Sequence, residues 1–188
     1  TWYVRAYLQL ANAYLIGGNK NEAINALGQG LSINDDLYRN FKTSITLKDQ
    51  FQQKLQEIKN QELQQIKSEI TQAETLPGMQ AIMAWKNALP KLYTLQPYGD
   101  QSAFELWQKI ILQAQNIGDT KKALDYSIEA LKEIKLRIKN YQNYSTEIDA
   151  IQAKKNTLEN TAEQIQKKKE ELQSALGAAY KAWQEKQY

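Results

Sequence analysis

The chain contains no cysteine and no histidine among its 188 residues. Without cysteine there is neither a disulfide nor a thiolate nucleophile, which is compatible with any cellular compartment. Without histidine there is no imidazole to serve as a general base, a pH-dependent switch or a zinc ligand. The sequence also shows no glycine-rich phosphate loop, nucleophile elbow or metal-ligand cluster. We therefore expect a protein that is not an enzyme and that holds no metal and no cofactor.

Proline and glycine are also scarce, with three and eight residues. Both residues break helices, and no segment alternates apolar and polar residues as a half-buried strand does. Gln, Lys, Leu, Ile and Ala fill the long segments instead. The sequence therefore predicts an all-α fold. Its helices are expected over residues 2–16, 21–33, 36–75, 79–89, 102–116, 120–140 and 146–186.

The helix expected over residues 36–75 leaves two interpretations open. Asp35 and Asp36 suit the start of one long helix, because carboxylates accept hydrogen bonds from free N–H groups at the positive end of a helix dipole. Alternatively, Ser44 or Thr46 begins a new helix. Further along, Pro90 is expected to kink or shorten its helix, because proline lacks the N–H that a helix interior uses.

The sequence has no long hydrophobic run and little net charge. No apolar stretch approaches the roughly 18 residues needed to cross a bilayer, so no membrane span is expected. The net charge is +3. The basic run Lys167–Lys169 is followed directly by Glu170 and Glu171, which dilute its field. This is typical of a solvated helix face rather than of a nucleic-acid-binding surface, and no nucleic-acid partner is expected.

Residues 7–30 and 107–130 share a pattern of residue types at equal offsets. The shared positions are an aromatic residue, a turn glycine and a later alanine, and they are occupied by Tyr7, Gly18 and Ala23 in one segment and by Trp107, Gly118 and Ala123 in the other. This pattern resembles the tetratricopeptide repeat, a helical hairpin that stacks into an α-solenoid. Ala81, Trp85 and Ala88 repeat its small–aromatic–small spacing, which predicts a degenerate hairpin between the other two.

The resemblance implies a groove lined by the first helix of each hairpin, which binds a helix or peptide of a protein partner. Its ligand-facing positions correspond to Arg5, Leu8, Asn12, Leu15 and Ile16 in the first hairpin and to Glu105, Gln108, Leu112, Gln115 and Asn116 in the second. Asn12 matches the asparagine that holds a peptide carboxylate in chaperone-binding repeats. Leu8 and Leu112 stand where that clamp needs a basic residue and a second asparagine, so we do not expect a carboxylate clamp. The chain's own long helices are an alternative occupant of the groove.

The last forty residues carry the longest regular apolar pattern, which we call the seam. Its members follow three- and four-residue steps and are Ile151, Leu158, Ala162, Ile165, Leu172, Leu176, Ala179 and Trp183, with Lys155 and Lys169 at two further positions. Such spacing predicts a coiled-coil-like helix. We expect it to pack back along residues 47–75, which have a similar seam. A continuous helix with a phase slip after residue 141 is the alternative.

The predicted domains are a hairpin array over 1–140, with the long helix 36–75 inserted, and a C-terminal helix over 141–188.

Two glycines interrupt the helix expected over residues 21–33. Gly28 and Gly30 each cost roughly 1 kcal/mol of helix propensity relative to alanine. A requirement for close packing against a neighbouring helix would explain their presence.

The leading functional hypothesis is a non-catalytic scaffold or adaptor for protein–protein interaction. Two alternatives are a structural subunit of a large multiprotein assembly and a regulatory helical arm of a larger enzyme.

Overall fold

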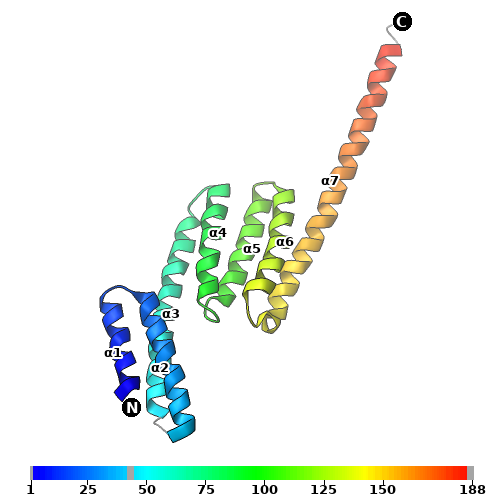
Figure 1. Ribbon diagram of the computed structural model, residues 1–188. Helices are drawn as coiled ribbons and strands as arrows, with labels where there is room; N and C mark the ends of the chain where they lie inside the picture. Colours follow the sequence, from blue (N-terminus) through cyan, green and yellow to red (C-terminus); the bar gives the residue numbers. More distant parts are fainter. Residues whose placement is uncertain (1, 42–44, 186–188) are drawn as a thin grey trace. The chain divides into compact units, whose positions relative to one another are not determined.

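The computed structural model describes residues 2–41 and 45–185, which are almost entirely helical (Figure 1). In this part of the chain there are seven α-helices, one short 3-10 helix and no strand, so the predicted all-α class is confirmed. The helices are α1 (Trp2–Ile16), α2 (Lys20–Phe41), α3 (Ile45–Ala73), α4 (Gly78–Thr94), α5 (Asp100–Asn116), α6 (Thr120–Arg137), η1 (Tyr141–Tyr144) and α7 (Ser145–Glu185).

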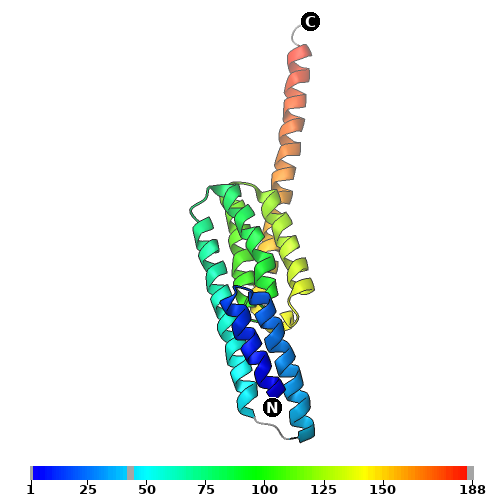
Figure 2. The same ribbon diagram turned by 60° about the vertical axis from the view of Figure 1, so that its left-hand side comes forward.

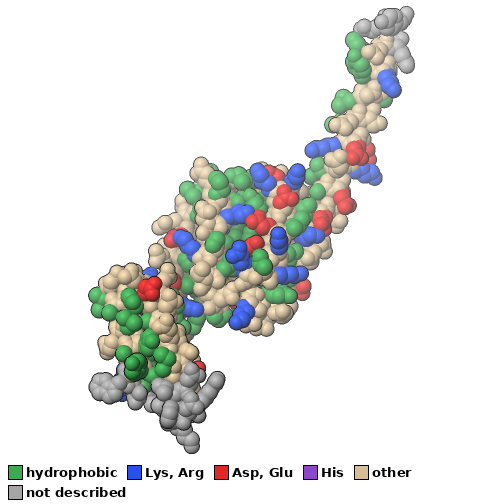
Figure 3. All heavy atoms as spheres, viewed as in Figure 1, with side chains coloured by type: hydrophobic (Ala, Val, Ile, Leu, Met, Phe, Trp, Pro, Cys, Tyr) green, Lys and Arg blue, Asp and Glu red, His purple; other side chains and the backbone are tan. Residues whose placement is uncertain are grey.

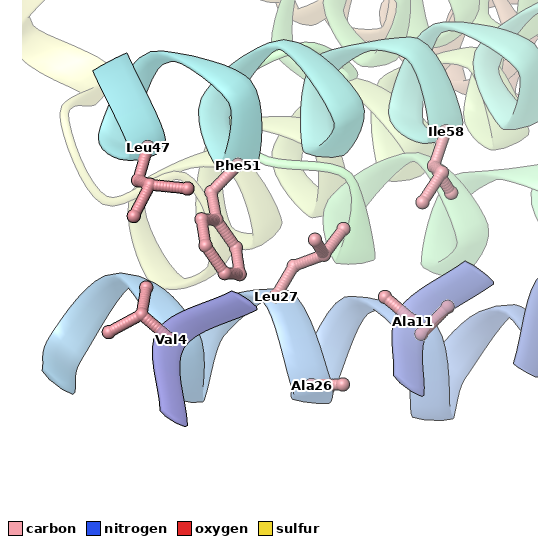
Figure 4. Packing of buried hydrophobic residues seen from close by; sticks show 8 residues of the cluster. Val4, Ala11, Ala26, Leu27, Leu47, Phe51 and Ile58 are labelled. Atoms are coloured by element: carbon pink, nitrogen blue, oxygen red, sulfur yellow. The ribbon is translucent and has the colours of Figure 1, made fainter. Parts of the chain in front are cut away.

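The chain divides into two compact units, Thr1–Ser68 and Glu69–Tyr188. The predicted boundary after residue 140 falls within the second unit, and the assignment of domains stays a prediction. In the first unit, α1 packs along α2, and the first part of α3 supplies the rest of the core. Figure 4 shows Leu47 and Phe51 of α3 pointing toward the side chains of α1 and α2. The buried residues of this core are Val4, Ala11, Ala23, Ala26, Leu27, Leu47, Phe51 and Ile58.

Gly30 has the packing role that the sequence suggested, whereas Gly28 does not. A Cβ atom at Gly30 would overlap the ring of Phe51 and would lie 3.0 Å from the Cβ of Tyr7. The absence of a side chain therefore lets Phe51 sit directly on the α2 backbone. A Cβ atom at Gly28 would have no neighbour within 4 Å, so packing in the first unit does not explain this glycine.

The predicted boundary near Asp35 and Asp36 is wrong. Helix α2 continues to Phe41, and α3 begins at Ile45. No proline or glycine interrupts residues 31–41, and the carboxylate of Asp35 pairs with Lys48 at 2.9 Å instead of capping a new helix. A start at Thr46 is close to the observed one, whereas Ser44 lies outside the described residues.

In the second unit, α4 packs on α5, α5 on α6, and α6 on α7. Positive-φ glycines accompany two of the connections: Gly78 begins α4, and Gly118 forms the α5–α6 turn. Asp119 then caps α6, because its side chain accepts a hydrogen bond from the N–H of Lys122 at 2.9 Å. The predicted breaks between residues 75 and 79 and between residues 116 and 120 are therefore confirmed.

Pro90 does not shorten its helix, which was one of the two effects that the sequence suggested. Helix α4 passes through Pro90 and continues to Thr94. Leu89 and Leu92, on either side of the proline, are buried, as is Trp85 one turn earlier. The indole N–H of Trp85 donates to the carbonyl of Ile70 at 3.1 Å, which fixes α4 against the end of α3. Burial of this face compensates for the hydrogen bond that proline cannot make.

The final helix forms as the sequence predicts, after a break at η1. Helix α6 ends at Arg137, slightly earlier than expected, and α7 runs from Ser145 to Glu185. Its first half packs on α6, while Figures 1 and 2 both show its second half continuing beyond the ends of α4, α5 and α6. The predicted partner, residues 47–75, belongs largely to the first unit, so packing against it stays a prediction.

Candidate functional site

The residues expected to line a groove on α1 divide into two groups. Arg5, Asn12 and Ile16 are exposed, and Ile16 keeps 90% of its surface accessible. Leu8 and Leu15 are half-buried and pack against the core of the first unit. These two leucines therefore contribute to the stability of the α1–α2 hairpin. Only the polar Arg5 and Asn12 and the apolar Ile16 form an exposed surface.

Two of the corresponding residues on α5 line a cavity. Gln108 and Leu112 border an open groove of about 230 Å³ between α5 and α7. Glu105 and Asn116 are exposed elsewhere on α5, and Gln115 is half-buried. The α1 set belongs to the first unit and the α5 set to the second, so the described geometry does not join them in one site.

The groove between α5 and α7 has an apolar floor and a polar edge. Its floor is formed by Ile111 of α5 and Ile151 of α7, which are both buried. Leu112 is half exposed at its side. Gln108 and Lys154 supply an amide and an ammonium group at the edge. A small apolar cavity with a few polar groups suits the side chain of a bound peptide or helix rather than a reaction.

A polar network within the second unit supports the wall of the groove. The Nζ of Lys86 on α4 lies 2.7 Å from Glu129 of α6 and 5.0 Å from the ring centre of Tyr126. The same ammonium group lies 6.0 Å from the ring centre of Trp107, whose indole N–H donates to the hydroxyl oxygen of Tyr93 at 2.8 Å. Burial raises the pKa of the Tyr93 hydroxyl to about 12, so it stays neutral. These contacts join α4, α5 and α6.

The base of α7 is held by a second group of contacts. The ring of Tyr144 in η1 lies against Phe104 of α5, with ring centres 4.9 Å apart, and its hydroxyl donates weakly to Asp100 at 3.5 Å. Asp100 is buried, and one of its carboxylate oxygens has no hydrogen-bond partner. Burial raises the pKa of this carboxyl, and the Tyr144 hydrogen bond opposes that effect only in part. The seam of α7 begins directly after this anchor.

The seam residues become more exposed to solvent along α7, from its start toward its end. Ile151 and Leu158 are buried, whereas Ile165 is 41% exposed and Leu172 is 61% exposed. A second cavity, of about 580 Å³, lies where the cover ends. It is bordered by the α5–α6 turn and by α7, with Ile117, Gly118, Asp119, Thr120, Lys121 and Leu124 on one side and Ala162, Ile165, Gln166 and Lys169 on the other. The sequence predicted the seam but not this cavity, because the approach of the α5–α6 turn to a distant part of the chain has no local signal.

Within the described ranges, no three Asp, Glu, His or Cys side chains gather closely enough to hold a metal ion. In the same ranges, no helix combines the length and the hydropathy that a membrane span requires.

The chain matches no protein-family model, no curated protein and no solved structure.

Proposed function

We propose that the chain is a non-catalytic scaffold that binds a helix or peptide of a partner protein in the groove between α5 and α7. One observation carries this proposal: Leu112 stands half exposed beside an apolar floor made by Ile111 and Ile151. An exposed leucine over such a floor offers a place for an apolar anchor residue of a partner. A further support for a scaffold is that α4 packs on α5, α5 on α6 and α6 on α7, as successive helices do in stacked helical hairpins.

The polar groups at the edge define the kind of segment that fits the groove. An apolar side chain would rest on Ile111 and Ile151, and an acidic group next to it would meet the ammonium group of Lys154. Gln108 can donate to, or accept from, the backbone of the bound segment. We therefore propose a partner segment with an apolar anchor and a neighbouring carboxylate.

A photoreactive amino acid placed at Leu112 tests the proposal. In an extract of the native source it should crosslink to a defined protein segment, which is then made as a synthetic peptide. The peptide should bind the unmodified chain, and Leu112→Asp should weaken this binding at least tenfold, because a carboxylate replaces the apolar contact. Binding is measured by titration calorimetry.

Leu136→Asp is the matched control, because Leu136 is 68% exposed and does not line the groove. It should leave the affinity for the peptide unchanged. If the two variants weaken binding equally, or if the captured segment does not bind as a purified peptide, the groove is not the binding site.

A structural role in a larger assembly is the second candidate function, and the exposed outer half of α7 favours it. A long helix with an uncovered apolar stripe provides a surface for another helix.

A further inference from the structure

The outer part of α7 carries an apolar stripe that the described helices of the second unit leave exposed. We call residues 165–183 the α7 arm. Every residue from 163 to 184 is exposed, although the stripe is continuous in sequence with Ile151 and Leu158, which are buried beside α6. Figure 3 shows hydrophobic side chains along this outer part of the helix. The large exposed residues of the α7 arm are Ile165, Leu172, Leu176, Tyr180 and Trp183.

We propose that the α7 arm pairs with the α7 arm of a second copy of this chain, in an antiparallel coiled coil. The pairing would continue the packing that α6 already provides for the first half of the same stripe. The α7 arm is roughly 28 Å long, or nearly three heptads. If each of its five large apolar residues loses roughly 100 Å² of exposed surface, two arms bury about 1,000 Å², which is the lower limit for a specific interface.

Lys169 determines the direction of the two helices. The core positions of the arm are Ile165, Lys169, Leu172, Leu176, Ala179 and Trp183. In a parallel, in-register pair, Lys169 would face its own copy at a position shielded from water, where like charges are unfavourable. In an antiparallel pair with Leu172 opposite the second copy's Leu176, Lys169 faces the small Ala179 instead. Its aliphatic stem can then cover the alanine while its ammonium group stays in water.

The same register places Ile165 opposite Trp183 of the second copy. Ile165 borders the cavity of about 580 Å³ beside the α5–α6 turn, together with the apolar residues Ile117, Leu124 and Ala162. Trp183 is 55% exposed, and its ring stacks on Tyr180 with ring centres 6.0 Å apart. The second copy's indole would therefore reach the mouth of this cavity, next to its apolar lining residues.

Charge does not oppose this arrangement. At the flanking positions, Ala175 faces Ala175 of the second copy, Gln173 faces the second copy's Gln173, and Lys168 faces Ala182. No two like charges meet across the pair. The acidic residues Glu170 and Glu171 lie on the outer side of the helix in this register.

The mass of the full chain in solution, measured by sedimentation velocity, tests the proposal. The unmodified chain should sediment as a dimer. Leu172→Asp should sediment as a monomer whose far-UV circular dichroism loses no more than the helical signal of the α7 arm, because Leu172 is 61% exposed and lies outside the core of its own unit. Leu136→Asp, at an exposed leucine outside the arm, should stay dimeric. A monomer for the unmodified chain at its highest soluble concentration would overturn the proposal, as would a dimer for Leu172→Asp.

Single cysteines test the direction, because the chain has none of its own. In the antiparallel pair, Ala175→Cys lies opposite its own copy and should be joined efficiently by a short bis-maleimide. Ala179→Cys is displaced by ten residues from its copy, or roughly 15 Å along the helix, and should not be joined. Efficient crosslinking of Ala179→Cys but not of Ala175→Cys would show a parallel pair and overturn the antiparallel register. Leu112 lies outside the arm, so failure here leaves the proposed groove binding untouched.

Discussion

Replacing Trp107 by alanine is expected to lower the free energy of unfolding of the second unit by about 4 kcal/mol. Trp107 is 1% exposed and lies on α5. Removing its side chain leaves a large cavity in the core of the second unit. It also removes the donor that the Tyr93 hydroxyl accepts from at 2.8 Å. Urea denaturation of the full chain, followed by circular dichroism at 222 nm, measures the loss.

Two conservative variants separate the cavity from the hydrogen bond. Trp107→Phe keeps most of the apolar volume but removes the indole N–H, whereas Tyr93→Phe removes the acceptor and leaves that N–H unpaired. Each should cost about 1–3 kcal/mol, which is less than the alanine variant. Equal losses for Trp107→Ala and Trp107→Phe would contradict the view that volume dominates at this position.

Opposite effects are expected from the same substitution at two neighbouring glycines of α2. Gly30→Ala should lower the free energy of unfolding of the first unit by about 2 kcal/mol, because the new methyl group would overlap the ring of Phe51. Gly28→Ala should raise it by about 1 kcal/mol, because alanine restricts the unfolded chain and favours helix while meeting no neighbour.

Each variant is the control for the other, since they share the helix and the chemical change. Amide hydrogen exchange in α1 and α2 measures the effect locally, so that the second unit does not obscure it. A stabilising effect of Gly30→Ala would show that Phe51 moves away freely and that close packing does not require this glycine.

Much of the fold could be predicted from the sequence because its signals are local. Apolar residues at three- and four-residue steps predicted the last helix, and Gly118 predicted the turn before α6. The predictions were wrong where contacts between residues far apart in the sequence determine the bounds of a helix. Asp35 looks like a helix cap, but it pairs with Lys48 across the α2–α3 connection. Pro90 looks like a helix end, but the burial of Leu89 and Leu92 carries α4 past it.

The candidate site was predictable only in part for the same reason. The repeat pattern indicated Gln108 and Leu112, which line the groove between α5 and α7. It gave no indication of Ala150, Ile151 and Lys154 on the opposite side, because no repeat position refers to them. Leu8 and Leu15 were expected to face a ligand, but they pack against the core of the first unit. The resemblance implies which positions of a helix face a ligand. Which of these side chains are exposed depends on how the neighbouring helices pack against them.

Amide hydrogen exchange tests most directly whether the outer half of α7 pairs with a second copy of the chain. A single helix without a packed neighbour opens easily, so residues 165–183 of an isolated chain should exchange rapidly. We predict that protection of these residues increases with protein concentration, while that of residues 145–158, beside α6, stays constant. Exchange in residues 165–183 that is equally fast at all concentrations would contradict this pairing.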